Sequence, residues 1–373
     1  MKLINLNSFT AEVEEKNISF LNSLQDKESK YHYLPVNLGI TKAGSKLSLG
    51  FSCYALKTYY ILGYWENTTD ANKKDWLRYI KSFQIISEKA SENLFVDPEY
   101  INFIKKFNMG SYVKESIKKS INITGLKSYQ TADVKFQNSI RAETKQSIST
   151  LYQVGDMQDH PYFEFENKDE KLLPFLDSLD WQNPWSAGGQ FSAMCVFSKI
   201  NDFQHNIRIL KNFSDRLVQP ENGGYYFGSQ PNSSLLINGA MKIITGLDWI
   251  DVPIHYPKKL IDLCLNIEPN DEGCDLVDIV YVLFKSSKET DYRKAEIKKY
   301  MLNLAETIQK HYKKNEGGFS YFLDKSQHEY YGVNISKGFN VPDIHGNLLL
   351  IWALSMINKL INEEDSHWKI LKP

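Results

Sequence analysis

The sequence predicts an all-α protein, and more narrowly an α/α toroid: an (α/α)6-like double barrel of helical hairpins. Three observations predict it. Helical periodicity runs through most of the chain, and long alternating segments typical of strands are hard to find. Helices that are apolar nearly all round alternate with amphipathic, charged ones. The apolar helices recur about every 40 to 70 residues, a spacing typical of arrays of helical hairpins.

The individual elements follow from this alternation. Residues 48–65 form an apolar helix, and a more polar one follows at residues 73–90. An apolar helix must be buried on most faces, whereas an amphipathic one keeps a face in water, so the apolar set should form an inner ring and the amphipathic set an outer one. The apolar helices are expected to begin near residues 48, 136, 183, 234, 274 and 343, with the amphipathic ones at 73–90, 168–181, 203–218, 256–267 and 292–314.

The chain is predicted to be a single domain over residues 1–373, because no Pro/Ser-rich linker divides it. Residues 1–47 form a polar leading segment with some helix, and the toroid core covers about 48–361. Residues 67–131 fit the hairpin pattern least well. Two stretches there, "VDPEYINFIKKF" and "SYVKESIKKSINITGL", have helical character without a clear partner.

Composition limits the function classes. Lys plus Arg is 44 against 45 for Asp plus Glu, a net charge of -1, so no overall field attracts nucleic acid or an anionic membrane. The N-terminus lacks the apolar core of a signal peptide. The longest strongly apolar run, Leu348–Ile357, is too short to span a bilayer. We expect a cytoplasmic protein with no nucleic-acid partner and no membrane span.

Two similar glycine pairs follow predicted outer helices. They lie in "ENGGYYFG", Glu221–Gly228, and in "NEGGFSYF", Asn315–Phe322. A glycine takes the left-handed conformation that commonly ends a helix without steric cost. We therefore expect each pair to cap an outer helix, and the aromatic residues that follow to wedge between neighbouring hairpins.

An acid or amide, two glycines and an aromatic at the end of outer helices resembles the repeat motif of the squalene cyclase, terpenoid cyclase and protein prenyltransferase superfamily. The resemblance covers roughly residues 48–361 and implies an α/α toroid whose central cavity holds an apolar, isoprenoid-type substrate, acted on by carboxylate acid chemistry. Other (α/α)6 barrels, including polysaccharide lyases and glycoside hydrolases, use Gly-Gly-aromatic turns as well.

The chain departs from this superfamily in two places. The Asp-x-Asp-Asp acid motif of class II terpene cyclases is missing, and "DLVD", Asp275–Asp278, is the nearest match. The Asp-x-Cys zinc pair of prenyltransferases would place Asp278 correctly but has Val280 where the Cys should be. His345 falls near the position of the family's zinc-binding His.

The strongest candidates for chemistry lie at two predicted inner-helix starts, "CDLVD" and "PDIHGN". Asp278 or Asp343 could act as a general acid whose pKa is raised by burial, with His345 as its partner. Asp275 lies on the same helix face as Asp278. Alternatively, Cys274, Asp278 and His345 could bind zinc.

Asp275 and Asp343 fit a structural role equally well, because Asp is a common helix N-cap. Asp278 is different, since it lies inside the apolar run "LVDIVYVLF". A buried carboxylate needs a partner or a function.

Other side chains could contact a substrate. Asn238 and Lys242 share a face of a mostly apolar helix, where the lysine could bind an anion or pair with an acid such as Asp278. Arg141, close to Glu143, fits an anion clamp or an internal salt bridge. Trp185, near a helix start, could line a cavity for an apolar or sugar ligand or pack in the core.

Three functions remain open. The first is an enzyme of the terpenoid cyclase and prenyltransferase type. The second is a carbohydrate-active (α/α)6 hydrolase or lyase that uses the same carboxylates in a wetter groove, with Trp185 and Tyr281 as sugar platforms. The third is a scaffold without catalysis, because a fold does not fix a function. No P-loop, GxGxxG, HExxH or GxSxG motif appears.

Overall fold

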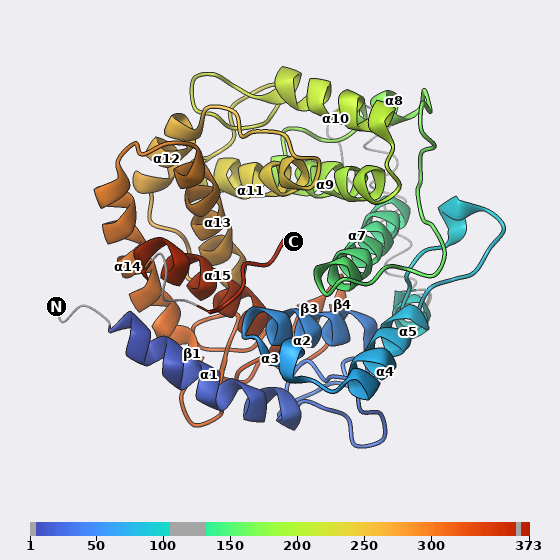
Figure 1. Ribbon diagram of the computed structural model, residues 1–373, viewed down its shortest axis with the longest axis vertical. Helices are drawn as coiled ribbons and strands as arrows, with labels where there is room; N and C mark the ends of the chain where they lie inside the picture. The colour runs from blue at the N-terminus through green and yellow to red at the C-terminus, as the bar shows by residue number, and fades with distance from the viewer. Residues whose placement is uncertain (1–4, 105–131, 363–366) are drawn as a thin grey trace.

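The computed structural model describes residues 5–104, 132–362 and 367–373, and within them six helices form a closed inner ring (Figure 1). Each inner helix packs against the next one in the ring, and the last returns to the first. The α/α toroid predicted from the sequence is confirmed, and the predicted helix starts lie close to the observed ones. The inner helices are α2 (Leu49–Ile61), α7 (Ala132–Gln153), α9 (Pro184–Ile200), α11 (Ser233–Trp249), α13 (Gly273–Glu289) and α15 (Ile344–Asn362).

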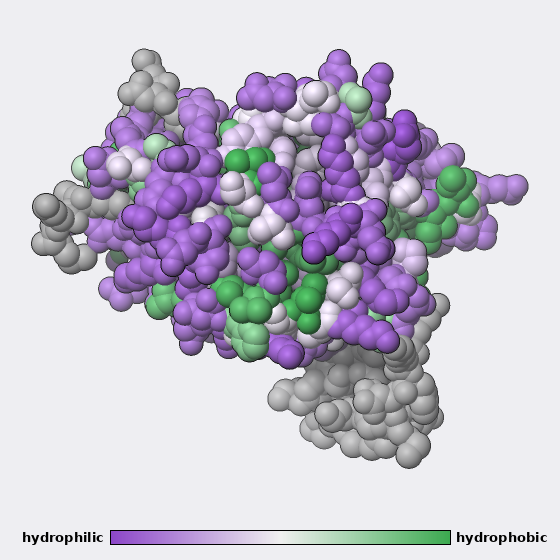
Figure 2. All heavy atoms as spheres, turned by 90° about the horizontal axis from the view of Figure 1, so that it is seen from below, coloured by the Kyte–Doolittle hydropathy of each residue, from purple (hydrophilic) through white to green (hydrophobic). Residues whose placement is uncertain are grey.

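The outer layer is amphipathic and covers the ring from outside (Figure 1). Seen from the side, its surface is mostly hydrophilic with small apolar areas between (Figure 2). Because these helices face water on one side, their apolar residues point toward the inner ring. The outer helices are α1 (Leu6–Ser23), α4 (Asp70–Lys81), α5 (Pro98–Ile104), α8 (Leu172–Asp177), α10 (Gln204–Leu217), α12 (Pro257–Leu265) and α14 (Lys294–His311), with the short helices α3 (Tyr64–Asn67) and η1 (Ala90–Glu92) beside them.

The predicted leading segment with some helix, residues 1–47, contains α1, which packs against α15. The prediction for the next amphipathic helix was wrong. The predicted helix at residues 73–90 ends at Lys81, where the chain turns back to form a bridge between Gln84 and Phe95. The stretch "SYVKESIKKSINITGL" lies outside the described residues.

Helix α15 is 19 residues long and, by length and composition alone, could cross a membrane. The prediction of no membrane span rested on its apolar middle alone, Leu348–Ile357, which is too short to cross a bilayer. In the structure 72% of its apolar window is buried inside the protein. Its hydropathy therefore reflects a place in the inner ring, where a helix is covered on nearly every side.

The glycine pairs do not cap helices as predicted, but turn short hairpins that follow the outer helices. After α14, strands β1 (Tyr312–Lys313) and β2 (Gly318–Phe319) pair antiparallel, and Gly317 in the turn has a φ of 76°. Gly223 has the same role after α10, with a φ of 74°. Only glycine adopts this conformation at little cost.

After several outer helices the chain folds back on itself, and the returning segment carries a buried aromatic residue. Antiparallel bridges follow α1, α4, α10 and α14, and each returning aromatic is 0% exposed. The aromatic residue thus anchors the end of the outer helix in the core, as the sequence analysis expected for the residues after the glycines. These anchors are Tyr33, Phe95, Tyr225 and Phe319.

Glycines also allow α9 and α11 to approach each other closely. A Cβ at Gly239 would lie 2.6 Å from Pro184, and one at Gly246 would lie 2.9 Å from the sulfur of Cys195. Larger residues would force the two backbones apart, so the close packing of α9 against α11 depends on glycine at these two positions.

The C-terminal tail, residues 367–373, lies across one end of the ring, where Figure 1 shows the chain end near the ring centre. The backbone N–H of Lys369 donates to the carbonyl of Ile61 at the end of α2, 2.8 Å away. The N–H of Lys372 donates to Gln153 of α7 at 2.7 Å, and Trp249 of α11 donates its indole N–H to the Pro373 oxygen at 2.6 Å. The tail therefore spans the C-terminal ends of helices from different sides of the ring.

A buried pair of asparagines joins the first helix to the last. Asn17 of α1 donates to Asn347 of α15 at 2.8 Å and receives a bond back at 3.2 Å. Asn17 also donates to the carbonyl of Gly317, and Asn347 accepts from the N–H of Phe319. Both asparagines are 0% exposed. Their amides thus provide hydrogen-bond partners for the buried carbonyl of Gly317 and the buried N–H of Phe319.

We predict that Asn347→Leu lowers the free energy of unfolding by about 2–4 kcal/mol, because it removes the bonds that Asn347 makes to the buried side-chain oxygen of Asn17 and to the buried Phe319 N–H. Urea denaturation of the two proteins measures the difference. The matched control is Asn362→Leu, which removes a less buried Asn pair between the same two helices, with Asn7. It should cost less than about 0.5 kcal/mol. Equal losses in the two variants would contradict the role assigned to the buried pair.

Candidate functional site

Ionisable side chains on four of the inner helices lie near one another: the charge of Lys242 acts on Lys145, Cys274, Asp278 and His345, and Glu143 lies near Tyr54, which stacks on His345. We call them the central cluster: Glu143 and Lys145 on α7, Lys242 on α11, Cys274 and Asp278 on α13, and His345 on α15. Glu143 and Asp278 are 1% exposed, whereas the other members are half-buried. The cluster is thus a mostly buried set of charged groups that keeps some contact with solvent, which is the usual setting of shifted pKa values.

Asp278 is the most unusual member. Both of its carboxylate oxygens are buried, and neither has a hydrogen-bond partner among the described residues. Burial raises its pKa to about 7; nearby Lys242 opposes this rise and the charge of Asp275 adds to it. A carboxyl of this kind exchanges its proton close to neutral pH, which is what a general acid requires.

Glu143 lies on α7, on the opposite side of the ring from α13. One oxygen accepts a hydrogen bond from the Tyr330 hydroxyl at 3.1 Å, and the other is buried without a described partner. Burial raises its pKa to about 8, with a further contribution from the charge of Asp97. The ring therefore holds two buried acids on facing helices; at neutral pH Glu143 is mostly protonated and Asp278 is about half protonated.

His345 is fixed between two aromatic rings. Its imidazole stacks on Tyr54 with centroids 4.7 Å apart and on Tyr321 at 5.4 Å. Its Nδ1 bonds to the Gln327 side-chain oxygen at 2.8 Å. Burial and the charge of Lys242 lower its pKa to about 3, so the ring is neutral under ordinary conditions. It can accept a hydrogen bond through Nε2 but cannot donate a proton as a partner acid.

Asp343 has a structural role. Its carboxylate accepts the backbone N–H groups of Gly346 at 2.7 Å, Tyr321 at 2.7 Å and Gln327 at 3.1 Å. Burial raises its pKa to about 6, and these N–H groups pull it back down. The N-cap interpretation of Asp343 is confirmed, and because the carboxylate is fully engaged, it is not available as the general acid that we also considered.

Asp275 is held in place too, although not as an N-cap. Its two oxygens accept amide hydrogen bonds from Asn238 and Asn270, both at 2.7 Å. The predicted substrate contact Asn238 therefore orients Asp275. Both carboxylate oxygens of Asp275 are therefore hydrogen-bonded, whereas those of Asp278 have no partner among the described residues.

The predicted zinc site is not formed. Among the described residues no group of three or more His, Cys, Asp and Glu side chains is placed to hold a metal ion. Cys274 and Asp278 are near each other, but His345 directs Nδ1 at Gln327 and lies flat between tyrosines. Burial also raises the pKa of the Cys274 thiol to about 11, away from the thiolate that zinc prefers.

The predicted binding residues divide into two kinds. Arg141 is occupied by an internal salt bridge, with Glu164 at 2.6 Å rather than with its neighbour Glu143. Tyr281 is 1% exposed and packs against Trp352, so it cannot serve as a sugar platform. Trp185, by contrast, is 43% exposed at the start of α9.

Trp185 and Lys242 form one surface at the edge of the cluster. The ammonium of Lys242 lies 5.7 Å from the centre of the indole ring. One helical turn after Trp185 comes Gly189, where an added Cβ would meet nothing within 4 Å. An accessible aromatic face, a cation and open space therefore lie together at the N-terminal part of α9.

Sequence reasoning missed Glu143 and Lys145 as members of the site. Glu143 was considered only as a partner for Arg141, and Lys145 was not considered. The available signal was weak: "RAETKQ" is simply a charged stretch on a helix predicted to be buried. Tyr330, which binds Glu143, is the last residue of β3 (Glu329–Tyr330), the strand that pairs with β4 (Val333–Asn334), and it is far away in sequence.

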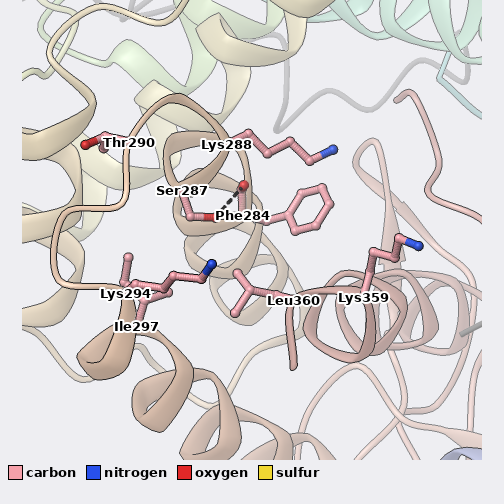
Figure 3. A pocket seen from close by; sticks show the side chains of 8 residues that line it. All are labelled: Phe284, Ser287, Lys288, Thr290, Lys294, Ile297, Lys359 and Leu360. Atoms are coloured by element: carbon pink, nitrogen blue, oxygen red, sulfur yellow. Dashed lines mark hydrogen bonds between the residues drawn. The ribbon is translucent and has the colours of Figure 1, made fainter. Parts of the chain in front are cut away.

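A surface cleft of ≈ 260 Å³ lies elsewhere, between the C-terminal ends of α13 and α15 and the start of α14 (Figure 3). Phe284, Ile297 and Leu360 form its apolar part. Its lysines are exposed, and Lys288 lies 4.3 Å from the Phe284 ring. Lysines near helix C-termini are favourable in themselves. The cleft lacks the buried acids of the central cluster, which remains the stronger candidate.

Fold and cluster together define an α/α toroid with a charged, acid-bearing centre. No protein-family model matches the sequence, and no curated protein matches it. Among solved structures, it is similar to an inactive variant of the α-1,6-mannanase GH76A of Salegentibacter sp. HEL1_6 in complex with α-1,6-mannotetrose, with 11% identity, a TM-score of 0.47, and coverage of 96% of this chain and 100% of that one.

A second similar structure is a possible member of the GH105 family from Salmonella enterica subsp. enterica serovar Paratyphi A, with 10% identity, a TM-score of 0.41, and coverage of 96% and 95%. Neither likeness, at this identity, says what the present chain acts on.

The resemblance to the terpenoid cyclase and prenyltransferase superfamily is wrong. The similar solved structures are a mannanase and a possible GH105 member, and neither is a cyclase or prenyltransferase. The glycine pairs that suggested the resemblance turn hairpins in this ring architecture and are not tied to a reaction. The charged centre is also unlike the apolar cavity that an isoprenoid chain would need.

We predict that Asp278→Asn stabilises the protein at high pH. The folded pKa of Asp278, about 7, exceeds the ordinary value of 3.8 that applies to the unfolded chain, so only the folded state holds the proton between these values. Wild-type stability therefore falls as pH rises through this window, whereas the Asn variant carries no charge. The gain should be near zero below pH 4 and up to about 4 kcal/mol above pH 8, at about 1.4 kcal/mol per pKa unit.

Denaturation curves at pH 4, 6 and 8 measure this difference. Asp275→Asn is the matched control, because Asp275 is three residues away and already accepts two amide bonds. A stability gain for Asp278→Asn that does not change with pH would show that Asp278 is ionised in the folded state.

Proposed function

We propose that this toroid is a carbohydrate-active enzyme, a hydrolase or a lyase, that works at the central cluster with Asp278 as the general acid. The observation that carries the proposal is the state of Asp278: a buried carboxyl with no described partner and a pKa of about 7. Keeping an unpartnered carboxyl inside a protein costs stability. Proton donation to a leaving group is a function that would justify this cost.

The surroundings of Asp278 suit a sugar. Sugars present hydroxyl groups that need polar partners and ring faces that pack on aromatic side chains. The half-buried Lys145, Lys242 and His345 supply polar groups, and Trp185 supplies an accessible aromatic face beside Lys242. The same polar lining does not suit a wholly apolar ligand.

The chemistry would begin with Asp278 donating its proton to the oxygen of the glycosidic bond, so that the bond breaks and Asp278 is left ionised. Lys242 lowers the pKa of Asp278, so its charge stabilises the carboxylate that forms. In a hydrolase the oxygen of an attacking water would bond to the anomeric carbon, and its proton would pass to the ionised form of Glu143 on the facing helix; because the pKa of Glu143 is about 8, this form is more abundant at alkaline pH. In a lyase a neutral amine is the natural base, and the pKa of Lys145 is lowered to about 7.

We predict that Asp278→Asn lowers turnover of a glycan substrate by about 100-fold or more, a typical contribution of a general acid. The substrate is first found by incubating the wild-type protein with a panel of polysaccharides. New reducing ends reveal cleavage of either kind, and ultraviolet absorbance of an unsaturated product identifies a lyase. Asp291→Asn, whose side chain is 95% exposed, is the control and should leave turnover unchanged. Wild-type turnover by the Asp278→Asn protein would overturn the proposal.

A second variant tests the location without touching an ionisable group. Gly189→Phe should place an aromatic ring in the open space beside Trp185 and block access to the cluster. Replacing a helical glycine also favours the helix, so the fold should be retained. We expect binding and turnover to fall together while the thermal unfolding midpoint is kept. Normal turnover in this variant would place the reaction elsewhere.

A further inference from the structure

Three lysines from three inner helices approach one another inside the ring: Lys57 on α2, Lys145 on α7 and Lys242 on α11. The charges of Lys57 and Lys242 both lower the pKa of Lys145, whose own burial is the largest cause. Lys57 is 6% exposed and its ammonium donates to the hydroxyl of Ser149 at 3.1 Å. The three side chains therefore bring like charges together where water is scarce.

None of these lysines forms an ion pair with a described residue. Two other lysines of the inner helices do. Lys199 pairs with Asp251 at 2.6 Å, and Lys285 pairs with Asp248 at 2.5 Å. Both of those pairs lie toward the C-terminal ends of inner helices. The ring thus neutralises its lysines at one end and leaves three of them without a counter-charge in the middle.

The nearby acids supply only part of that counter-charge at neutral pH. Burial raises the pKa of Glu143 to about 8 and of Asp278 to about 7, so Glu143 is mostly protonated and Asp278 about half protonated. The carboxylate of Asp275 already accepts amide hydrogen bonds from Asn238 and Asn270. Burial keeps the Cys195 and Cys274 thiols neutral by raising their pKa, and His345 is uncharged. The centre therefore carries a net positive charge. Leaving a cation buried without a counter-ion is costly.

We propose that the substrate is an acidic sugar, whose carboxylate, sulfate or phosphate group is bound by Lys242. This inference rests on the proposed carbohydrate function. An anionic group on the ligand supplies the missing charge, and hydrogen bonds between ionised partners are the strong ones. Lys242 is the first contact, because it lies beside the exposed Trp185, so the sugar ring packs on the indole while its acidic group faces the ammonium.

Binding is tested with a pair of ligands that differ only in charge: oligomers of galacturonic acid and the same oligomers as methyl esters. Titration calorimetry with the Asp278→Asn protein measures affinity without turnover. We expect the acid form to bind and the ester form to bind at least about tenfold more weakly, the loss typical for one charged hydrogen bond. Raising the salt concentration should weaken the acid form only.

The source of the negative charge is identified with glucuronate, glucose 6-sulfate and glucose 6-phosphate, compared with glucose. Ligand-observed NMR ranks these four compounds, which differ at one position. Stronger binding of any acidic member over glucose supports the proposal and names the group. Equal binding of all four, together with equal binding of the oligomer pair, overturns it.

Variants locate the contact. Lys242→Gln should lose about tenfold or more in affinity for the acidic ligand, and Lys242→Arg should keep most of it, because the charge remains. Lys359→Gln, in the exposed surface cleft, is the matched control and should bind normally. Melting curves check that each variant is folded. Unchanged acidic-ligand affinity in a folded Lys242→Gln protein overturns the assignment.

The two proposals fail in different ways. If neutral glycans are bound and cleaved as well as acidic ones, with loss of turnover in Asp278→Asn, the carbohydrate function stands and the acidic-substrate inference is wrong. If no glycan of either kind is bound or cleaved, the carbohydrate function fails, and the inference fails with it.

Discussion

Closure of the ring is the constraint on which the rest of this structure depends. A helix that is apolar on nearly every face has no stable place at a surface, and a row of such helices always leaves two of them at its ends. Bringing α15 back against α2 removes both ends. The buried Asn17–Asn347 pair adds a second link between the two ends of the chain, because it joins the outer helix α1 to α15 and makes hydrogen bonds that an apolar contact could not.

Ring closure also explains why the centre is chemically distinct. Parallel inner helices bring their corresponding positions to the same level, so a few polar residues on separate helices become neighbours. At the C-terminal end, these are ion pairs such as Lys285 with Asp248. Farther inside they are lysines and buried acids that form no ion pairs with one another among the described residues, with aromatic rings around them. The ring provides the enclosure in which the pKa values of these groups shift.

Much of the fold could be predicted from the sequence, because apolar and amphipathic helices differ in local pattern alone. The helix following Ser48 and the one following Asp343 were recognisable in this way. The glycine pairs were misjudged because a helix cap and a hairpin turn place glycine in the same conformation, and only the returning strand distinguishes them. Helix α1 was underestimated because its apolar face is narrow and its partner, α15, comes last in the chain.

The site was harder to predict, since its members depend on distant contacts. Asp278 could be singled out because an acid inside an apolar run is unusual by itself. Asp343 could be placed at a helix start, but whether its carboxylate was free depended on the N–H groups of Tyr321 and Gln327. Nothing local distinguished Glu143 from Glu164, although the second neutralises Arg141 and the first stays unpaired on one oxygen.

The C-terminal tail makes Trp249 a reporter of ring closure. The tail partners Ile61, Gln153 and Trp249 come from three helices widely separated in the chain, so the complete set of tail contacts requires the closed ring. The indole of Trp249 donates to the tail backbone, and the ammonium of Lys372 lies over its ring. The local environment of this tryptophan therefore differs between a docked and an undocked tail.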